Sequence, residues 1–341
     1  MSEMNAIIFQ DIGKWGFEKR PVPQVRKPSD VLVEVEAASI CGTDVHVLGN
    51  PPGFIGTKGI ILGHECVGVV RETGSDVGGL KAGDRVVLVP NLHCGYCRYC
   101  RIGWPNMCEN EKVMGVTVDG VFSKYFVAPE NALTKVPQDM PMDLAVFCEP
   151  VKCVMGAMDM IRVLPGETAL VLGGGPIGLY FVMLLKRNGA RTVIVSEPSA
   201  YRAEYARMCG ADVIVDPTKE DLREVVRAHT NGLGADITID AVGVLIKDAI
   251  DCVRRAGRVV LMGQNGAVKE TICQNDIVSN GLQIYGNYIG RHIMPATVDV
   301  LSAGLIPVEQ IITHRLPMSR FAEGLDAMRK GLGLEVILYP D

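Results

Sequence analysis

Hydrophobic and polar residues alternate in short runs along the first part of the chain. The run Val31-Leu-Val-Glu-Val-Glu36 alternates strictly, and residues 65–70 and 84–89 form Val-rich runs that follow turn residues. A period of two residues is the pattern of β-strands, and Gly, Pro and Asp between the runs mark turns. The pattern predicts a β-rich region that extends to about residue 135.

The hydrophobic pattern changes at about residue 168. Stretches of helical periodicity now separate short, uninterrupted apolar runs, which lie at residues 169–172, 193–195, 213–215, 237–239 and 259–262. Buried strands that alternate with helices are typical of βαβ units, whose parallel sheet is covered on both faces. This part of the chain is therefore expected to be an α/β domain.

Two domains follow from these patterns. A helix over residues 151–161 is expected to join them, and the regular alternation stops after residue 286. We expect a first domain of residues 1–150, completed by residues 287–341, and a second domain of residues 151–286. A length of 341 residues agrees with this division, because one domain has about 150 residues on average.

Composition narrows the class of protein. Hydrophobic residues make up 48% of the chain and charged residues 21%, which is ordinary for a globular protein. The net charge is −5 and there is no basic block, so nucleic acid is not an expected partner. The chain has no secretory signal pattern and no run of about 18 apolar residues, so we expect a cytoplasmic protein without a membrane partner.

Four of the eleven cysteines lie close together, in the spacing Cys94-x2-Cys97-x2-Cys100-x7-Cys108. In a reducing compartment, clustered cysteines favour metal ligation over disulfides. Four thiolates saturate a tetrahedral zinc ion and leave no position for a substrate. An iron–sulfur cluster also takes four thiolates, but the ferredoxin spacing that ends in C-x3-C-P is absent. The spacing predicts a structural zinc site that braces a loop.

The segment Gly173-Gly-Gly-Pro-Ile-Gly178 matches G-x-G-x-x-G between a buried apolar run and a predicted helix. The N-terminus of that helix offers free N–H groups to a pyrophosphate. The first glycine suits the turn, the second leaves room for the pyrophosphate, and the third lets helix and strand pack closely. Proline suits the first helical turn. The residues expected at the dinucleotide are Gly173, Gly175, Pro176, Ile177 and Gly178.

An acidic residue, Glu197, follows the next predicted strand, 19 residues after Gly178. Such a carboxylate accepts hydrogen bonds from the adenosine ribose and repels a 2′-phosphate, so NAD is favoured over NADP. Arg202 leaves an alternative open, because it can flank the ribose of NAD or help to bind a phosphate. Glu197 as a surface residue that caps the following helix is a second alternative.

Two further segments carry residues of the types that bind metals. One is Cys41-Gly-Thr-Asp-Val-His46, and the other begins with Gly63-His-Glu. A catalytic zinc takes three protein ligands and keeps one position for water or substrate. Cys41, His64 and Glu149 would supply one thiolate, one imidazole and one carboxylate.

Taken in chain order, these segments, the four-cysteine loop, the Glu149-Pro150 pair and the nucleotide fold resemble the zinc-dependent medium-chain dehydrogenase/reductase family. The chain is most similar to its polyol (sorbitol-like) and L-threonine dehydrogenase branch, and the match spans nearly the whole chain. The resemblance implies an α/β protein with a doubly wound Rossmann sheet and a GroES-like β-rich catalytic domain that carries two zinc sites. It also implies a homodimer or homotetramer.

The resemblance implies Cys41 and His64 as ligands of the catalytic zinc. Either Glu65 or Glu149 is the third ligand, and the sequence leaves this choice open. When the glutamate beside the histidine is not a ligand, it can hold the metal-bound water. Asp44 matches the carboxylate that fixes the tautomer and tilt of His64.

Thr43 and His46 are three residues apart and can share one helical face. They are expected to relay the alcohol proton to solvent, and by resemblance the ribose hydroxyl of the cofactor bridges them. Zinc would favour the deprotonated alcohol, which then gives hydride to NAD.

We expect reversible oxidation of a secondary alcohol of a polyol or sugar alcohol to a ketone. Oxidation of L-threonine at its hydroxyl is the second reading. A non-enzymatic protein stapled by zinc would leave the nucleotide segment without a purpose, and a zinc-free enone reductase would not need Cys41 and His64.

Three basic residues bear on the charge of the substrate. Lys152, Arg291 and His292 lie on segments that are expected to approach the substrate. If two of them face inward, the substrate carries a carboxylate or phosphate. Otherwise they are solvated or contact the cofactor pyrophosphate.

Overall fold

The structure, a computed structural model, describes residues 2–341. It divides into two compact units. Unit 1 contains residues 2–150, 291–304 and 312–341, and unit 2 contains residues 151–290 and 305–311. One helix, α4 (Cys148–Ile161), begins in unit 1 and continues into unit 2. None of the helices within residues 2–341 is long and apolar enough to cross a bilayer.

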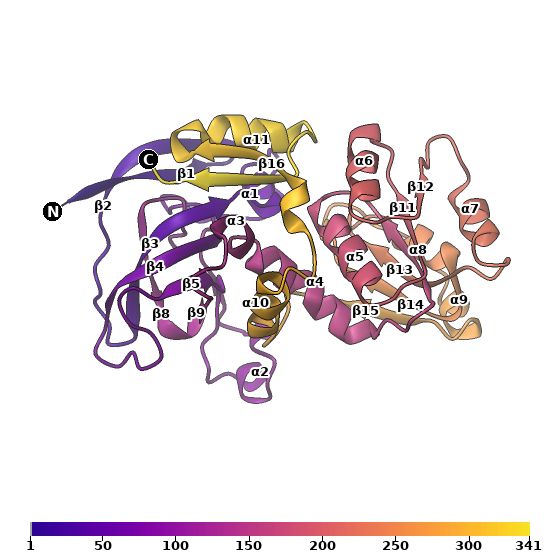
Figure 1. The fold of residues 1–341 in the computed structure, drawn as a ribbon, viewed down its shortest axis with the longest axis horizontal. Helices are drawn as coiled ribbons and strands as arrows, with labels where there is room; N and C mark the ends of the chain where they lie inside the picture. Colours follow the sequence, from indigo (N-terminus) through magenta and orange to yellow (C-terminus); the bar gives the residue numbers. More distant parts are fainter. Residues whose placement is uncertain (1) are drawn as a thin grey trace. The chain divides into compact units, whose positions relative to one another are not determined.

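Unit 1 is built around a seven-stranded sheet of the order β16-β17-β3-β4-β5-β9, with β8 also paired to β3. Its strands are β3 (Asp30–Ser39), β4 (Glu65–Thr73), β5 (Arg85–Leu88), β8 (Tyr125–Pro129), β9 (Leu133–Lys135), β16 (Ile312–Pro317) and β17 (Glu335–Tyr339). The alternating pattern at residues 31–36 is β3, and its apolar side chains belong to the core of this unit. Figure 1 shows the C-terminal strands, in yellow, beside the indigo N-terminal strands.

Short elements complete unit 1. Two small sheets pair β1 with β2 and β6 with β7. Their strands are β1 (Glu3–Asp11), β2 (Lys14–Pro21), β6 (Asn91–Leu92) and β7 (Lys112–Val113). The helices are α1 (Gly42–Val47), α2 (Arg98–Arg101), η1 (Pro105–Met107), η2 (Glu130–Ala132), α3 (Met142–Ala145), α10 (Met294–Ser302), η4 (Met318–Arg320) and α11 (Phe321–Arg329).

The register of the central strands determines where the candidate ligands lie. In the antiparallel pair β3–β4, Ser39 lies opposite Glu65. Cys41 follows the end of β3 and His64 immediately precedes β4. Both residues therefore lie at the same end of this strand pair.

Unit 2 contains a parallel six-stranded sheet of the order β12-β11-β10-β13-β14-β15. Its strands are β10 (Thr168–Leu172), β11 (Thr192–Ser196), β12 (Val213–Val215), β13 (Ala235–Asp240), β14 (Val253–Leu261) and β15 (Gln283–Gly286). The predicted apolar runs lie in five of these strands. Its helices are α5 (Pro176–Arg187), α6 (Ala200–Met208), α7 (Leu222–Ala228), α8 (Ile246–Cys252), α9 (Gln274–Ser279) and η3 (Val308–Ile311).

The strand order of unit 2 indicates where a ligand is expected to bind. The chain moves from β10 to one edge of the sheet and then returns to build the other half from β13 (Figure 1). Right-handed crossovers in these two directions put helices on opposite faces, as a doubly wound sheet requires. Ligands of such sheets bind where the order reverses, beyond the carboxyl ends of the strands. Here that point lies between β10 and β13.

Candidate active site

The four cysteines of the zinc loop come together in unit 1. The sulfur atoms of Cys94, Cys97, Cys100 and Cys108 all lie within 4.8 Å of one another. Backbone N–H groups point at two of these sulfurs: Cys97 donates to Cys94 Sγ at 3.3 Å, and Cys94 donates to Cys108 Sγ at 3.3 Å. Cys97 precedes the short helix α2, Cys100 lies within it, and Cys108 follows η1. All four residues are free thiols rather than disulfides.

The electrostatics of this cluster fit a soft dication. Partial desolvation raises the pKa of Cys94, but the N–H groups of Cys97 and Tyr96 outweigh it and lower that pKa to about 6. Desolvation and the neighbouring Cys97 thiol raise the pKa of Cys100 to about 12. Four thiolates at this spacing repel one another unless a cation lies between them, and zinc satisfies four such ligands in tetrahedral geometry.

A second group of candidate ligands lies at the β3–β4 end of unit 1. Cys41, His64 and Glu65 each offer a ligand atom, and these atoms lie within 4.8 Å of one another. His64 is 6% exposed and Glu65 is 2% exposed. The β3–β4 register brings the three residues together although Cys41 and His64 are 23 positions apart in the sequence.

Asp44 connects helix α1 to this cluster. The backbone N–H of Cys41, at the start of α1, donates to Asp44 Oδ2 at 2.9 Å. The other carboxylate oxygen, Oδ1, lies 3.8 Å from His64 Nδ1. Asp44 therefore fixes the start of the helix and faces one nitrogen of the imidazole, which leaves Nε2 for a metal.

The protonation of the second cluster also fits a metal site. Burial, followed by the charge of Asp44, raises the pKa of Cys41 to about 12. Burial and the neighbouring Cys41 raise the pKa of Glu65 well above its usual range. Within residues 2–341, the buried Oε2 of Glu65 accepts no hydrogen bond. A dication reverses these penalties, because it stabilises the thiolate and carboxylate that low dielectric disfavours.

Of the two glutamates left open by the sequence, only Glu65 belongs to this cluster. Glu149, at the start of α4, is buried, and its charge raises the pKa of both Cys41 and Glu65. It is close enough to act electrostatically without sharing the ligand geometry.

Sequence reasoning missed Glu335. This buried residue of β17 also raises the pKa of Glu65, and its Oε2 accepts a hydrogen bond from Ser39 Oγ at 3.2 Å. A carboxylate at the head of the apolar run Val336–Leu338 was the available signal. Only the pairing of β17 with β3 brings it to the site.

Thr43 and His46 both lie on α1, as expected for a shared helical face. Thr43 hydrogen-bonds the Cys41 side chain through its backbone and its hydroxyl. The ring of His46 packs edge-on against Phe54, with centroids 5.8 Å apart, and the N–H of Gly53 donates to His46 O at 2.9 Å. The helix thus positions a hydroxyl beside the cluster and an imidazole near its C-terminal end.

The glycine segment of unit 2 has the geometry of a dinucleotide loop between β10 and α5. Gly173 has a φ of +99°, which a side chain would strain. A Cβ atom on Gly178 would lie 1.9 Å from Gly173 O, so helix and loop pack in contact at this point. The atom nearest to a Cβ atom on Gly175 would be Arg202 Nη1, 4.0 Å away, so there is open space beside this glycine. Pro176 and Ile177 form the first turn of α5.

Glu197 lies immediately after β11 and is 5% exposed. Its two carboxylate oxygens accept hydrogen bonds from Gly174 N at 2.7 Å and from Ser199 N at 2.8 Å. It is a buried carboxylate held beside the glycine loop, not a surface residue. The cap of the following helix α6 is Ser199, whose side chain accepts from Arg202 N.

The basic residues of the expected pocket have different surroundings. Lys152 on α4 is buried. Arg291 is exposed and donates to Gly103 O at 3.1 Å, with its guanidinium 3.7 Å from the ring centroid of Trp104. Arg291 thus contacts the four-cysteine loop, a position that the sequence did not suggest.

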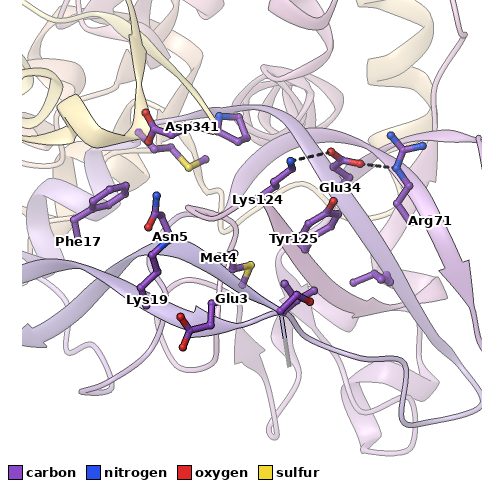
Figure 2. Close-up of a pocket in the computed structure, with 15 residues that line it drawn as sticks. Glu3, Met4, Asn5, Phe17, Lys19, Glu34, Arg71, Lys124, Tyr125 and Asp341 are labelled. Carbon is purple, nitrogen blue, oxygen red and sulfur yellow. Dashed lines mark hydrogen bonds and ion pairs between the residues drawn. The ribbon is translucent and has the colours of Figure 1, made fainter.

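A separate cavity of 640 Å³ lies elsewhere in unit 1, beside β1, β2 and the C-terminus. Figure 2 shows its charged lining, where Glu34 pairs with Arg71 at 2.6 Å and with Lys124 at 3.8 Å. None of the candidate ligands or nucleotide residues lines it. This cavity takes no part in the candidate site.

Comparison with known proteins agrees with this geometry. The family model described as alcohol dehydrogenase GroES-like domain matches residues 27–138, and the one described as zinc-binding dehydrogenase matches residues 176–303. An L-threonine 3-dehydrogenase from Caldanaerobacter subterraneus is 33% identical over 337 residues, covering 94% of either chain. The chain belongs to the zinc-binding alcohol dehydrogenase family.

Solved structures extend the likeness to the whole dehydrogenase. A protein from Sinorhizobium meliloti, described as a zinc-binding dehydrogenase and bound to NADP, superposes with a TM-score of 0.93, 31% identity and full coverage of both chains. The 2R,3R-butanediol dehydrogenase of Bacillus subtilis gives a TM-score of 0.90 at 28% identity, over 99% of this chain and 100% of that one. The dehydrogenase is thus an oxidoreductase that acts on CH–OH groups with zinc and NAD or NADP. This finding excludes the alternative of a non-enzymatic protein stapled by zinc.

Proposed function

We propose that this dehydrogenase oxidises a secondary alcohol of a neutral polyol or sugar alcohol to a ketone, with NAD as the hydride acceptor. The observation that carries the proposal is the cluster of half-buried Cys41 with buried His64 and Glu65 at one end of the β3–β4 pair. The three residues form the ligand set of a catalytic zinc, and Cys94, Cys97, Cys100 and Cys108 form that of a structural zinc.

The remaining residues have positioning and proton-transfer roles in this proposal. When bound, zinc supplies a Lewis acid that makes an alcohol hydroxyl more acidic. Asp44 holds the imidazole of His64 in the orientation that a ligand needs. The Thr43 hydroxyl takes up the proton of the alcohol as it gives up its own, and that proton passes through His46 to solvent. The N-terminus of α5 binds the cofactor pyrophosphate, and Glu197 binds the adenosine ribose.

The charges around the metal ligands favour a neutral substrate. Asp44, Glu149 and Glu335 act on the pKa values of Cys41 or Glu65, so three carboxylates lie close to the proposed zinc ligands. The charge of a zinc ion would be balanced by its own anionic ligands, Cys41 and Glu65, so the three further carboxylates would repel a substrate carboxylate or phosphate. Hydroxyl groups can instead donate hydrogen bonds to them. The engagement of Arg291 with the zinc loop removes one of the cations that an anionic substrate would use.

L-Threonine is the second candidate substrate. The relative from Caldanaerobacter subterraneus is an L-threonine 3-dehydrogenase, and its likeness extends over 94% of the chain. Threonine also carries a secondary alcohol, and its ammonium group would be attracted by the same carboxylates. The carboxylate of L-threonine would need a cation to bind it. Lys152 is the buried basic residue that lies nearest in sequence to Glu149.

A substrate screen tests the proposal. Neutral polyols, vicinal diols, L-threonine, sugar acids and sugar phosphates are each offered with NAD, and formation of NADH is followed by absorbance. Cys41→Ser, which removes a zinc ligand, serves as the blank, because activity that survives in it does not come from this site. We expect the highest kcat/KM for a neutral polyol. A higher value for L-threonine would replace the polyol by the amino acid, and an anionic sugar as best substrate would contradict the argument from charge. A cytoplasmic homodimer or homotetramer stays a prediction.

A further inference from the structure

Arg291 binds the four-cysteine loop of unit 1 through two contacts. Its guanidinium donates to Gly103 O at 3.1 Å and stacks 3.7 Å from the ring centroid of Trp104. Both partners lie between Cys100 and Cys108, the last two ligands of the cluster. We call these two contacts the Arg291 latch.

The latch lies where the chain passes from unit 2 to unit 1, between Gly290 and Arg291. The backbone there is strained: Ile289 and His292 have left-handed φ angles of +51° each. A β-branched residue rarely adopts this conformation, and such residues persist only where surrounding contacts hold them. On the unit 2 side, helix α4 fixes Gly290, because a Cβ atom on Gly156 would lie 2.5 Å from Gly290 Cα. On the unit 1 side, the latch holds Arg291.

The latch partners have little hydrophobic support of their own. Trp104 is 41% exposed, and its loop neighbours Ile102 and Tyr96 are 59% and 64% exposed. A loop that buries so little apolar surface depends on its metal for its conformation, as small metal-stapled folds do. The orientation of Gly103 O and of the Trp104 ring therefore depends on the ion held by the four cysteines.

We propose that Arg291 is a positioning residue through which metal at the four-cysteine cluster fixes the crossover segment Ile289–His292. With metal bound, the loop presents Gly103 O and the Trp104 ring, and the strained segment is held. Without metal, the loop loses its shape, Arg291 is released, and the segment relaxes from its left-handed angles. The proposal depends on a metal at this cluster and not on the identity of the alcohol substrate.

Cleavage by trypsin tests the latch directly, because trypsin cuts after arginine and lysine and therefore after residue 291. The intact dehydrogenase is digested under native conditions, with its zinc or after treatment with a chelator, and the cut after residue 291 is identified by mass spectrometry. We expect the cut to be about tenfold faster without zinc, because cleavage follows the population of the opened segment. Emission of Trp104, followed in a Trp15→Phe background, should change in the same zinc titration.

Variants distinguish loss of the latch contacts from a general loosening of the protein. Trp104→Leu removes the stacked ring, and Arg291→Lys keeps the charge and the trypsin site but loses the planar guanidinium. Both are expected to be cut faster at residue 291 while still loaded with zinc, and zinc content is measured in each. Cys41→Ser, which loses only the other metal, should stay as resistant as the parent.

Equal rates of the cut with and without zinc would overturn the proposal. The proposal would also be overturned if both latch variants were cut after residue 291 as slowly as the parent. Faster cleavage at this position in Cys41→Ser would overturn it as well. A protein that holds zinc and shows the protected cut but oxidises no alcohol would contradict the proposed function alone.

Discussion

At the scale of single residues, Glu65 and Glu149 differ in geometry although either fits the zinc ligand set by type. Glu65 shares the cluster with Cys41 and His64, whereas Glu149 acts on it only through its charge. Glu65→Gln should therefore weaken zinc binding at this site by more than about 100-fold, beyond the loss typical of outer-shell changes. Glu149→Gln should weaken it by about tenfold or less. Competition with a chromogenic chelator measures both, and a larger loss in Glu149→Gln would reverse the choice.

We expect the choice between NAD and NADP to depend on one residue, Glu197. Glu197 is buried beside the glycine loop and accepts from Gly174 N at 2.7 Å, so a 2′-phosphate there would meet a fixed negative charge. We expect the parent to prefer NAD, although the Sinorhizobium meliloti relative was solved with NADP. Glu197→Gln keeps the shape and removes the charge, so the ratio of kcat/KM for NAD to that for NADP should fall by about tenfold or more, or about 1.4 kcal/mol. Glu204→Gln, on the exposed face of α6, is the control and should leave the ratio unchanged. A parent that prefers NADP would contradict the assignment of Glu197.

At the scale of elements, the contact between α5 and the glycine loop is the most sensitive point of unit 2. A Cβ atom on Gly178 would lie 1.9 Å from the backbone oxygen of Gly173, and a backbone atom cannot move aside as a flexible side chain can. Gly178→Ala should lower the free energy of unfolding by about 1–3 kcal/mol, as overpacking does, and weaken NAD binding. Urea unfolding and an NAD titration measure the two effects.

Gly266→Ala is the matched control for this prediction. A Cβ atom on Gly266 meets nothing within 4 Å, so neither stability nor NAD binding should fall. If Gly178→Ala were as stable as this control, the close approach of helix and loop would not be a determinant of the fold.

The elements also show what the sequence could and could not reveal. The strand runs, helix α5 and the four-cysteine loop depend on neighbours in sequence, and their patterns predicted them. The cluster of Cys41 and Glu65 depends on the register of β3 against β4, which a single sequence does not specify. Glu335 reaches the site through β17, which pairs with β3 from the other end of the chain. The family resemblance supplied Cys41 and His64 as ligands, but it could not choose between Glu65 and Glu149.

At the scale of the whole molecule, the fold identifies the reaction type more firmly than the substrate. A candidate catalytic zinc site in unit 1 and a dinucleotide loop in unit 2 are what alcohol oxidation by hydride transfer requires, and the four-cysteine cluster of unit 1 is a structural addition. The substrate depends on a few charges around the metal ligands, and relatives with the same fold differ in their alcohols. The substrate is thus inferred from the charged residues of the site, whereas the fold indicates which cofactors bind.

The two units should respond to different ligands when the molecule unfolds. Each unit has its own hydrophobic core, and within residues 2–341 both candidate metal clusters belong to unit 1. Calorimetry should therefore resolve a transition that a chelator lowers and added zinc restores, and a second one that NAD raises. NAD at roughly 100 times its Kd stabilises the state that binds it by about 2.7 kcal/mol. Gly178→Ala assigns the second transition, because its overpacking is confined to unit 2. A single transition that moves with both zinc and NAD would show instead that the units unfold as one cooperative body.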